Sequence, residues 1–104
     1  MAWVEVGPLD ELPPGSMKLV EASGIEVGVY NCSGELHAIE DRCSHDDGPL
    51  CEGDWDEDFC RVVCPRHGAN FDLRTGQPVT LPATEPVDVF PVEVADGIVR
   101  VNVS

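Results

Sequence analysis

The sequence is poor in basic residues and has no long apolar run. Only 6 Lys and Arg residues stand against 20 Asp and Glu residues, which gives a formal net charge of −14. This balance excludes general nucleic-acid binding, because a protein that binds phosphates needs a basic face. No segment approaches the roughly 18 consecutive apolar residues of a membrane-spanning helix, so we expect no membrane association. The acidic surface favours solubility and association with an electropositive partner.

The N-terminal segment lacks the features of an export signal. Residues 1–5 contain no basic group, and no apolar run follows them, so we expect a cytoplasmic protein. The chain also lacks a Ser/His/Asp constellation and a glycine-rich phosphate-binding motif. We therefore do not expect it to be an enzyme by itself.

The chain also lacks a sustained 3.6-residue helical period and internal repeats. Nine prolines and ten glycines separate short stretches in which apolar and polar residues alternate, which is typical of β-strands joined by turns. Composition and periodicity predict one all-β domain over residues 1–104, a sandwich or a barrel. Pro91 should place its strand at an edge or a bulge. The expected strands are residues 3–6, 17–21, 25–30, 36–40, 52–55, 59–63, 69–73, 87–94 and 98–103.

The sequence does contain two pairs of cysteine and histidine. Cys43 and His45 form a Cys-x-His pair, Cys64 and His67 form a Cys-x-x-His pair, and residues 46–63 separate them. Two thiols and two imidazoles are the donor set of a metal site. A structural zinc ion could use them, although zinc cysteines are usually paired on one knuckle. A 2Fe–2S cluster of the Rieske kind needs two Cys on one iron and two His on the other, and two loops of mixed ligands supply this arrangement.

With these two pairs, and with residues 71–76 after them, the sequence resembles the Rieske-type ferredoxins. The resemblance covers nearly the whole chain, including its valine-rich C-terminal strands. It implies an all-β Rieske fold, in which an antiparallel β-sandwich base carries a small cluster-binding subdomain at about residues 41–73. It also implies one 2Fe–2S cluster per chain, held at the molecular tip by Cys43, His45, Cys64 and His67.

The same resemblance implies a function. Soluble bacterial ferredoxins of this kind serve aromatic ring-hydroxylating dioxygenase systems as one-electron carriers. They accept an electron from a flavoprotein reductase and pass it to a terminal oxygenase or another redox enzyme. Two alternatives remain open at this point: a small Rieske-like subunit of a larger reductase, such as nitrite reductase, and a non-redox zinc-binding module.

The chain departs from the high-potential members of the family at four positions. Gly48 and Arg66 stand where those members have the cysteines of a disulfide between the loops. Ala69 and Phe71 stand where a serine and a tyrosine hydroxyl would donate hydrogen bonds to cluster sulfurs. Such hydrogen bonds raise the reduction potential because they stabilise the more negative reduced state. We therefore predict a low-potential cluster.

Three cysteines fall outside the ligand pairs. Cys32, Cys51 and Cys60 are expected to be reduced and mostly packed thiols. Cys51 and Cys60 flank a candidate hairpin, so a cross-link between them would also be geometrically allowed. His37 has no neighbours at ligand spacing, and we interpret it as an ordinary hairpin residue. Trp55 is expected mainly to pack against the core, although with Pro49 it could border the tip.

Overall fold

A computed structural model of the chain describes residues 3–42, 49–51, 53–65, 68–80 and 85–103. These residues form antiparallel strands in three sheets, with strand orders β1-β10-β9, β2-β3-β4-β8 and β5-β6-β7. No helix among them is long and apolar enough to cross a membrane. The all-β prediction is confirmed. The elements are β1 (Trp3–Pro8), the 3-10 turn η1 (Leu9–Glu11), β2 (Met17–Ala22), β3 (Ile25–Cys32), β4 (Glu35–Glu40), β5 (Trp55–Asp56), β6 (Arg61–Val63), β7 (Asn70–Asp72), β8 (Val89–Phe90), β9 (Val92–Ala95) and β10 (Ile98–Asn102).

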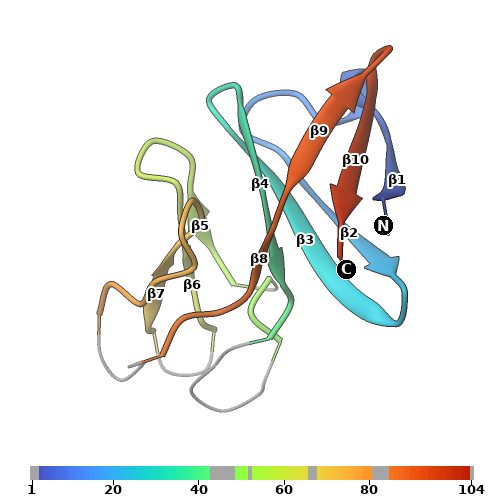
Figure 1. Ribbon diagram of the computed structural model, residues 1–104. Helices are drawn as coiled ribbons and strands as arrows, with labels where there is room; N and C mark the ends of the chain where they lie inside the picture. Colours follow the sequence, from blue (N-terminus) through green and yellow to red (C-terminus); the bar gives the residue numbers. More distant parts are fainter. Residues whose placement is uncertain (1–2, 43–48, 52, 66–67, 81–84, 104) are drawn as a thin grey trace.

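The four-stranded sheet is the middle of three layers (Figure 1). On one face of β3, Val27 and Val29 pack in a core shared with β1 and β10. On the other face, Tyr30 and Cys32 belong to a second core shared with β6 and β7. The alternation of apolar residues in 25–30 predicted the buried face that carries Val27 and Val29. The opposite face of β3 is buried as well, because the sheet β5-β6-β7 covers it. The sheet β5-β6-β7 therefore rests on the base through an apolar interface.

Three hairpins turn through two residues whose second member is glycine. Ser23-Gly24, Ser33-Gly34 and Asp96-Gly97 all have positive φ at both positions. This conformation is typical of type I′ turns, whose twist matches that of the strands they join. The turns predicted at these three places are confirmed.

Pro91 divides the predicted strand 87–94 into two. Before it, β8 pairs with β4 in the middle sheet, and after it, β9 pairs with β10 in the outer sheet. Proline has no N–H group to donate to a ladder, so the chain can change sheets here at little cost. The backbone carbonyl of Pro91 still accepts from Asn102 N at 3.0 Å. The edge or bulge expected at Pro91 is therefore the point at which the chain passes from the middle sheet to the sheet β1-β10-β9.

The cysteines outside the ligand pairs differ from the prediction. Cys32 and Cys60 form a disulfide with their Cα atoms 5.5 Å apart, so the expectation of three reduced thiols is wrong. The alternative link between Cys51 and Cys60 is also wrong, because Cys51 is a free, buried thiol. The tip of the β3–β4 hairpin and the turn before β6 meet across the interface between two layers. A sequence separation of 28 residues gives no sign of this contact.

Candidate metal centre

The second cysteine–histidine loop is the turn of the β6–β7 hairpin. The strands end at the pair Val63 and Asn70. Beyond it, Cys64 N donates to Ala69 O at 2.7 Å, and Gly68 N donates to Cys64 O at 2.9 Å. Cys64 is a buried thiol outside any disulfide, which leaves its sulfur available to a metal. Gly68 has φ +75°, a left-handed conformation that favours glycine.

Gly68 faces open space among the described atoms. No described atom lies within 4 Å of the place where its Cβ would stand. The positive φ therefore explains the glycine within the described part of the chain.

The first loop runs from the end of β4 to β5, over residues 41–54. At its start, Asp41 Oδ1 accepts hydrogen bonds from Leu50 N at 2.9 Å and from Cys51 N at 2.7 Å. Leu50 and Cys51 are buried in the core beneath the sheet β5-β6-β7. The loop thus leaves the base at Asp41 and returns to the core at Leu50.

The two loops meet at Gly53. A Cβ atom on Gly53 would collide with the backbone oxygen of Val63 and would approach Pro65 Cδ to 3.1 Å. Val63 N also donates to Asp54 O at 2.8 Å, so the end of the first loop lies directly against the start of the second. A cavity of about 370 Å³ opens here, and its lining residues are Gly53, Asp54, Val63, Cys64, Pro65 and Gly68.

One predicted ligand, Cys64, lies within the described residues. Cys43, His45 and His67 lie outside them, as do Gly48 and Arg66. The donor chemistry fits a 2Fe–2S cluster with two cysteine and two histidine ligands, and the buried, unbonded Cys64 beside the other loop agrees with it. Among the described residues alone, no group of three or more His, Cys, Asp or Glu side chains could hold a metal ion. The full ligand set stays a prediction.

The side chains packed around Cys64 are apolar. Ala69 and Phe71 are fully buried in the core that contains Cys64. Trp55 also packs against this core and meets Tyr30 edge-on, with ring centroids 4.9 Å apart and an interplanar angle of 74°. The packing role predicted for Trp55 is confirmed. These side chains, together with the buried Leu50, form the apolar floor of the two loops.

His37 lies on the β3–β4 hairpin, away from both loops. Its Nε2 is 3.1 Å from Glu35 Oε1, and Glu35 also meets the guanidinium of Arg74 at 3.1 Å. The hydrogen bond from His37, followed by the contact with Arg74, lowers the pKa of the exposed Glu35 carboxyl. The interpretation of His37 as an ordinary hairpin residue is confirmed.

Sequence reasoning missed a buried polar group below the first loop. The Tyr30 hydroxyl is buried without a hydrogen-bond partner among the described atoms, and burial raises its pKa far above the ordinary value, with a further contribution from nearby Cys51. Burial likewise raises the pKa of the Cys51 thiol to about 12.

The close approach of Cys51 to β3 explains a glycine in that strand. A Cβ on Gly28 would collide with Cys51 Sγ. A glycine inside a valine-rich strand often marks such a close approach, and that signal was available in the sequence.

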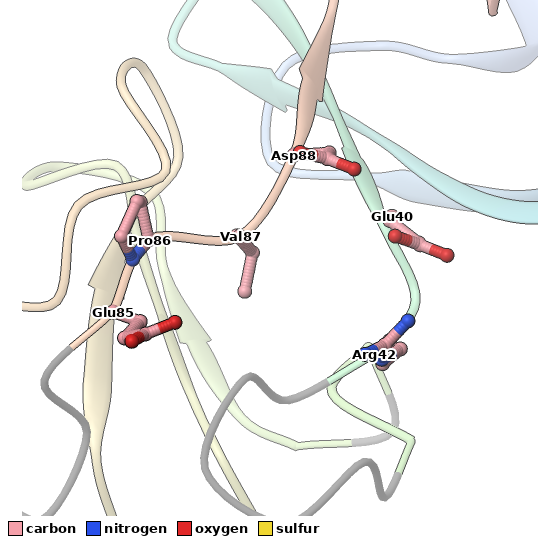
Figure 2. A pocket seen from close by; sticks show the side chains of 6 residues that line it. All are labelled: Glu40, Arg42, Glu85, Pro86, Val87 and Asp88. Carbon is pink, nitrogen blue, oxygen red and sulfur yellow. The ribbon is translucent and has the colours of Figure 1, made fainter.

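A polar cavity of about 190 Å³ lies beside the end of β4 (Figure 2). Glu40 N donates to Asp88 O at 3.0 Å, and Val87 N donates to Gly76 O at 2.8 Å, which holds segment 85–88 near the start of the first loop. The described residues that line it contain no thiol or imidazole. Its lining residues are Glu40, Arg42, Glu85, Pro86, Val87 and Asp88.

Comparison with known proteins agrees with this geometry. The profile of the Rieske [2Fe-2S] domain matches residues 2–91. The 3-phenylpropionate/cinnamic acid dioxygenase ferredoxin subunit of Photorhabdus laumondii is 40% identical over 104 residues, which cover 100% of this chain and 97% of the relative. The solved ferredoxin of carbazole 1,9a-dioxygenase from Nocardioides aromaticivorans has a TM-score of 0.90 and 34% identity, covering 97% of each chain. A chain in the solved complex of reduced oxygenase and oxidised ferredoxin of a carbazole 1,9a-dioxygenase has a TM-score of 0.88 and 37% identity, covering 96% of this chain and 92% of that one.

Proposed function

The chain belongs to the Rieske [2Fe-2S] domain family, and we propose that it is a soluble one-electron carrier of an aromatic ring-hydroxylating dioxygenase system. Its cofactor is a 2Fe–2S cluster. The proposed ligands are Cys43 and Cys64 on one iron and His45 and His67 on the other. The proposed domain organisation is a single domain, residues 1–104, with a cluster-binding subdomain at about residues 41–73. The proposed location is the cytoplasm.

One observation carries this proposal. A complete set of two Cys and two His is distributed over two loops, and the described arms of these loops lie against each other at Gly53 and Val63. The only proposed ligand within the described residues, Cys64, is buried and outside the disulfide. A carrier of this family needs this juxtaposition, because each loop supplies only one of the two protein ligands of each iron.

The residues of the chain have separate roles at this centre. When bound, the cluster supplies one-electron chemistry. Cys64 binds as a thiolate at the start of the β6–β7 turn, and the histidines bind as neutral imidazoles through one ring nitrogen. The apolar floor that contains Leu50 and Phe71 keeps water away from the inner side of the loops. Their outer side is the expected route of the electron.

The proposed partners are a flavoprotein reductase as electron donor and the terminal oxygenase of the system as acceptor. The support is the similarity to a dioxygenase ferredoxin subunit and to a chain in a solved complex of oxygenase and ferredoxin. The net charge of −14 favours electropositive docking surfaces on both partners. Electron-transfer encounters are weak and transient. Because salt screens the attraction between the acidic protein and its partners, the reaction rates should fall as the salt concentration rises.

The first test is analysis of the protein purified without air. Two irons and two acid-labile sulfides per chain, with a Rieske EPR signal after dithionite reduction, are the expected results. One zinc and no sulfide would overturn the cluster assignment. The second test adds a flavoprotein reductase, NADH and the terminal oxygenase of an aromatic-ring dioxygenase. Aromatic product that depends on this protein supports the carrier role, whereas stable co-purification with a large reductase subunit would indicate the subunit role instead.

A further inference from the structure

The carboxylate of Asp41 connects the two ends of the first loop. Asp41 follows the last residue of β4, and its Oδ1 atom accepts from Leu50 N at 2.9 Å and from Cys51 N at 2.7 Å. Its own backbone N–H donates to Glu26 O at 2.8 Å. The exit of the loop is therefore hydrogen-bonded to a residue that is itself fixed to the middle sheet.

Packing on the far side of this connection leaves little room for movement. Leu50 is fully buried, and Cys51 Sγ fills the space beside Gly28 that a Cβ would need. Gly53 N donates to Leu50 O at 3.1 Å, and Gly53 lies against the backbone of Val63. A shift at Leu50 would therefore reach the arm that borders the second loop.

The second loop is closed differently. Two backbone hydrogen bonds, from Cys64 N to Ala69 O and from Gly68 N to Cys64 O, close it within one hairpin, and the Asn70 side chain adds a longer bond to Gly68 O at 3.3 Å. The first loop is longer and joins two different sheets, because it runs from β4 in the middle sheet to β5 in the sheet β5-β6-β7. Its two ends are joined through a side chain, so its closure depends on the identity of one residue.

We propose that Asp41 is a positioning residue for the 2Fe–2S cluster. By accepting two N–H groups at the loop exit, it sets the distance between the loop ends and thereby the place where Cys43 and His45 are presented. A cluster tolerates only small errors in ligand position, on the order of 0.2 Å. The inference rests on the ligand set proposed above, and Asp41 acts through the loop backbone.

The test compares three variants with the wild-type holoprotein. Asp41→Ala removes the acceptor, and Asp41→Asn keeps an acceptor oxygen at nearly the same place. Asp56→Ala is the matched control, because Asp56 Oδ1 also accepts two backbone N–H groups, from Asp58 at 2.8 Å and Phe59 at 3.1 Å. That turn contains no proposed ligand. The measurements are iron and sulfide content, the EPR g values, the midpoint potential and the rate of iron loss to a chelator.

Asp41→Ala is expected to lose iron at least about tenfold faster than the wild type, because it removes two hydrogen bonds to a charged group and the loss of one such bond already corresponds to about tenfold. The cluster that remains should show changed g values and a shifted potential, because its ligands come from a repositioned loop. Asp41→Asn should lose iron at a rate close to that of the wild type, and Asp56→Ala should match the wild type in all four measurements.

Two failures are distinguishable. A wild-type protein without two irons and a Rieske signal would refute the proposed ligand set. A wild-type protein with its cluster, but an Asp41→Ala variant that matches Asp56→Ala in g values, potential and iron loss, would overturn the role of Asp41 alone. Should Asp41→Ala fail to fold, Asp41→Ser replaces it, because its shorter hydroxyl cannot span to both N–H groups. Wild-type behaviour of Asp41→Ser would also refute the role.

Discussion

Cys32 and Cys60 join the tip of the β3–β4 hairpin to the turn that precedes β6. The tips of the β3–β4 and β5–β6 hairpins lie at the same end of the molecule (Figure 1). The described parts of the two cluster loops lie at the opposite end, where β4 and β6 finish. The same junction carries polar contacts, in which Arg74 binds Glu35 at 3.1 Å and Ser33 binds Glu57 at 3.3 Å. The disulfide is therefore a covalent connection between the base and the sheet β5-β6-β7, on the side away from the proposed centre.

Removing this disulfide should destabilise the fold. A Cys32→Ala/Cys60→Ala variant is expected to lose roughly 3 to 4 kcal/mol of unfolding free energy, because a bridge across 28 residues restricts the unfolded chain by about this amount. Denaturant unfolding measures the loss. The EPR signal of the folded variant should remain that of the wild type, because the cysteines lie far from the loops.

Cys51→Ala is the matched control for that variant, since it truncates a buried sulfur without breaking the bridge. Alkylation of the cluster-free, unreduced protein in denaturant checks the bridge itself. It should label three of the five cysteines. Labelling of all five would show that the bridge does not form.

The ligand assignment predicts which histidines matter. His67→Ala and His45→Cys should abolish or replace the Rieske EPR signal, because each removes an imidazole from the histidine-bound iron. His37→Ala should leave the signal unchanged, since His37 contacts Glu35 on the hairpin. Iron analysis and EPR of the reduced variants test this prediction. Loss of the signal in His37→Ala, with retention in His67→Ala, would contradict the assignment.

The apolar floor of the centre predicts a low reduction potential. Rieske clusters span roughly −150 to +300 mV, and this one should lie near the lower end of the range. Ala69 and Phe71 are fully buried beside Cys64, and neither can donate a side-chain hydrogen bond. Ala69→Ser/Phe71→Tyr should therefore raise the midpoint by roughly 20 to 60 mV for each new hydrogen bond, as a net hydrogen-bond energy converted for one electron.

A dye-mediated redox titration of the wild type and the double variant measures both quantities. Ala69→Gly/Phe71→Leu is the control, because it changes the packing and adds no donor. A wild-type midpoint above +100 mV, or a double variant without an upward shift, would refute this account of the potential.

Local patterns predicted much of this fold. The alternation in residues 98–103 is confirmed, because Val99 and Val101 are buried while Ile98, Arg100 and Asn102 are partly exposed. The serine–glycine and aspartate–glycine turns were visible because their conformation requires particular residues. The change of sheet at Pro91 was foreseen only as an irregularity, since a proline shows where a ladder is interrupted but not where the chain goes next.

The missed features depend on contacts between distant segments. The ligand pairs were identified because each is local in sequence, at spacings that metal sites use. The partner of Cys32 could not be identified, because it follows from the packing of two layers. Asp41 was missed for a related reason: it acts on backbone N–H groups nine and ten residues away, and such groups leave no side-chain pattern.

The buried Cys51 thiol predicts that stability falls at alkaline pH. Its pKa is raised by burial from 9.0 to about 12, so the folded protein keeps the proton over a range in which the unfolded chain loses it. The unfolded state then binds fewer protons, and the free energy of unfolding should fall from about pH 9 upward by up to about 1.4 kcal/mol per pH unit. Below pH 8 both states are protonated and Cys51 should contribute no slope.

Cys51→Ala isolates this effect from the other titrating groups. The difference in unfolding free energy between the wild type and Cys51→Ala should be constant from pH 7 to 8 and should narrow by about 1.4 kcal/mol by pH 10. Tyr30 has a raised pKa as well, but its ordinary value of 10.0 places most of its contribution above this range, and both proteins retain it. A difference that stays constant up to pH 10 would show that the Cys51 thiol ionises as readily in the folded protein as in the unfolded chain.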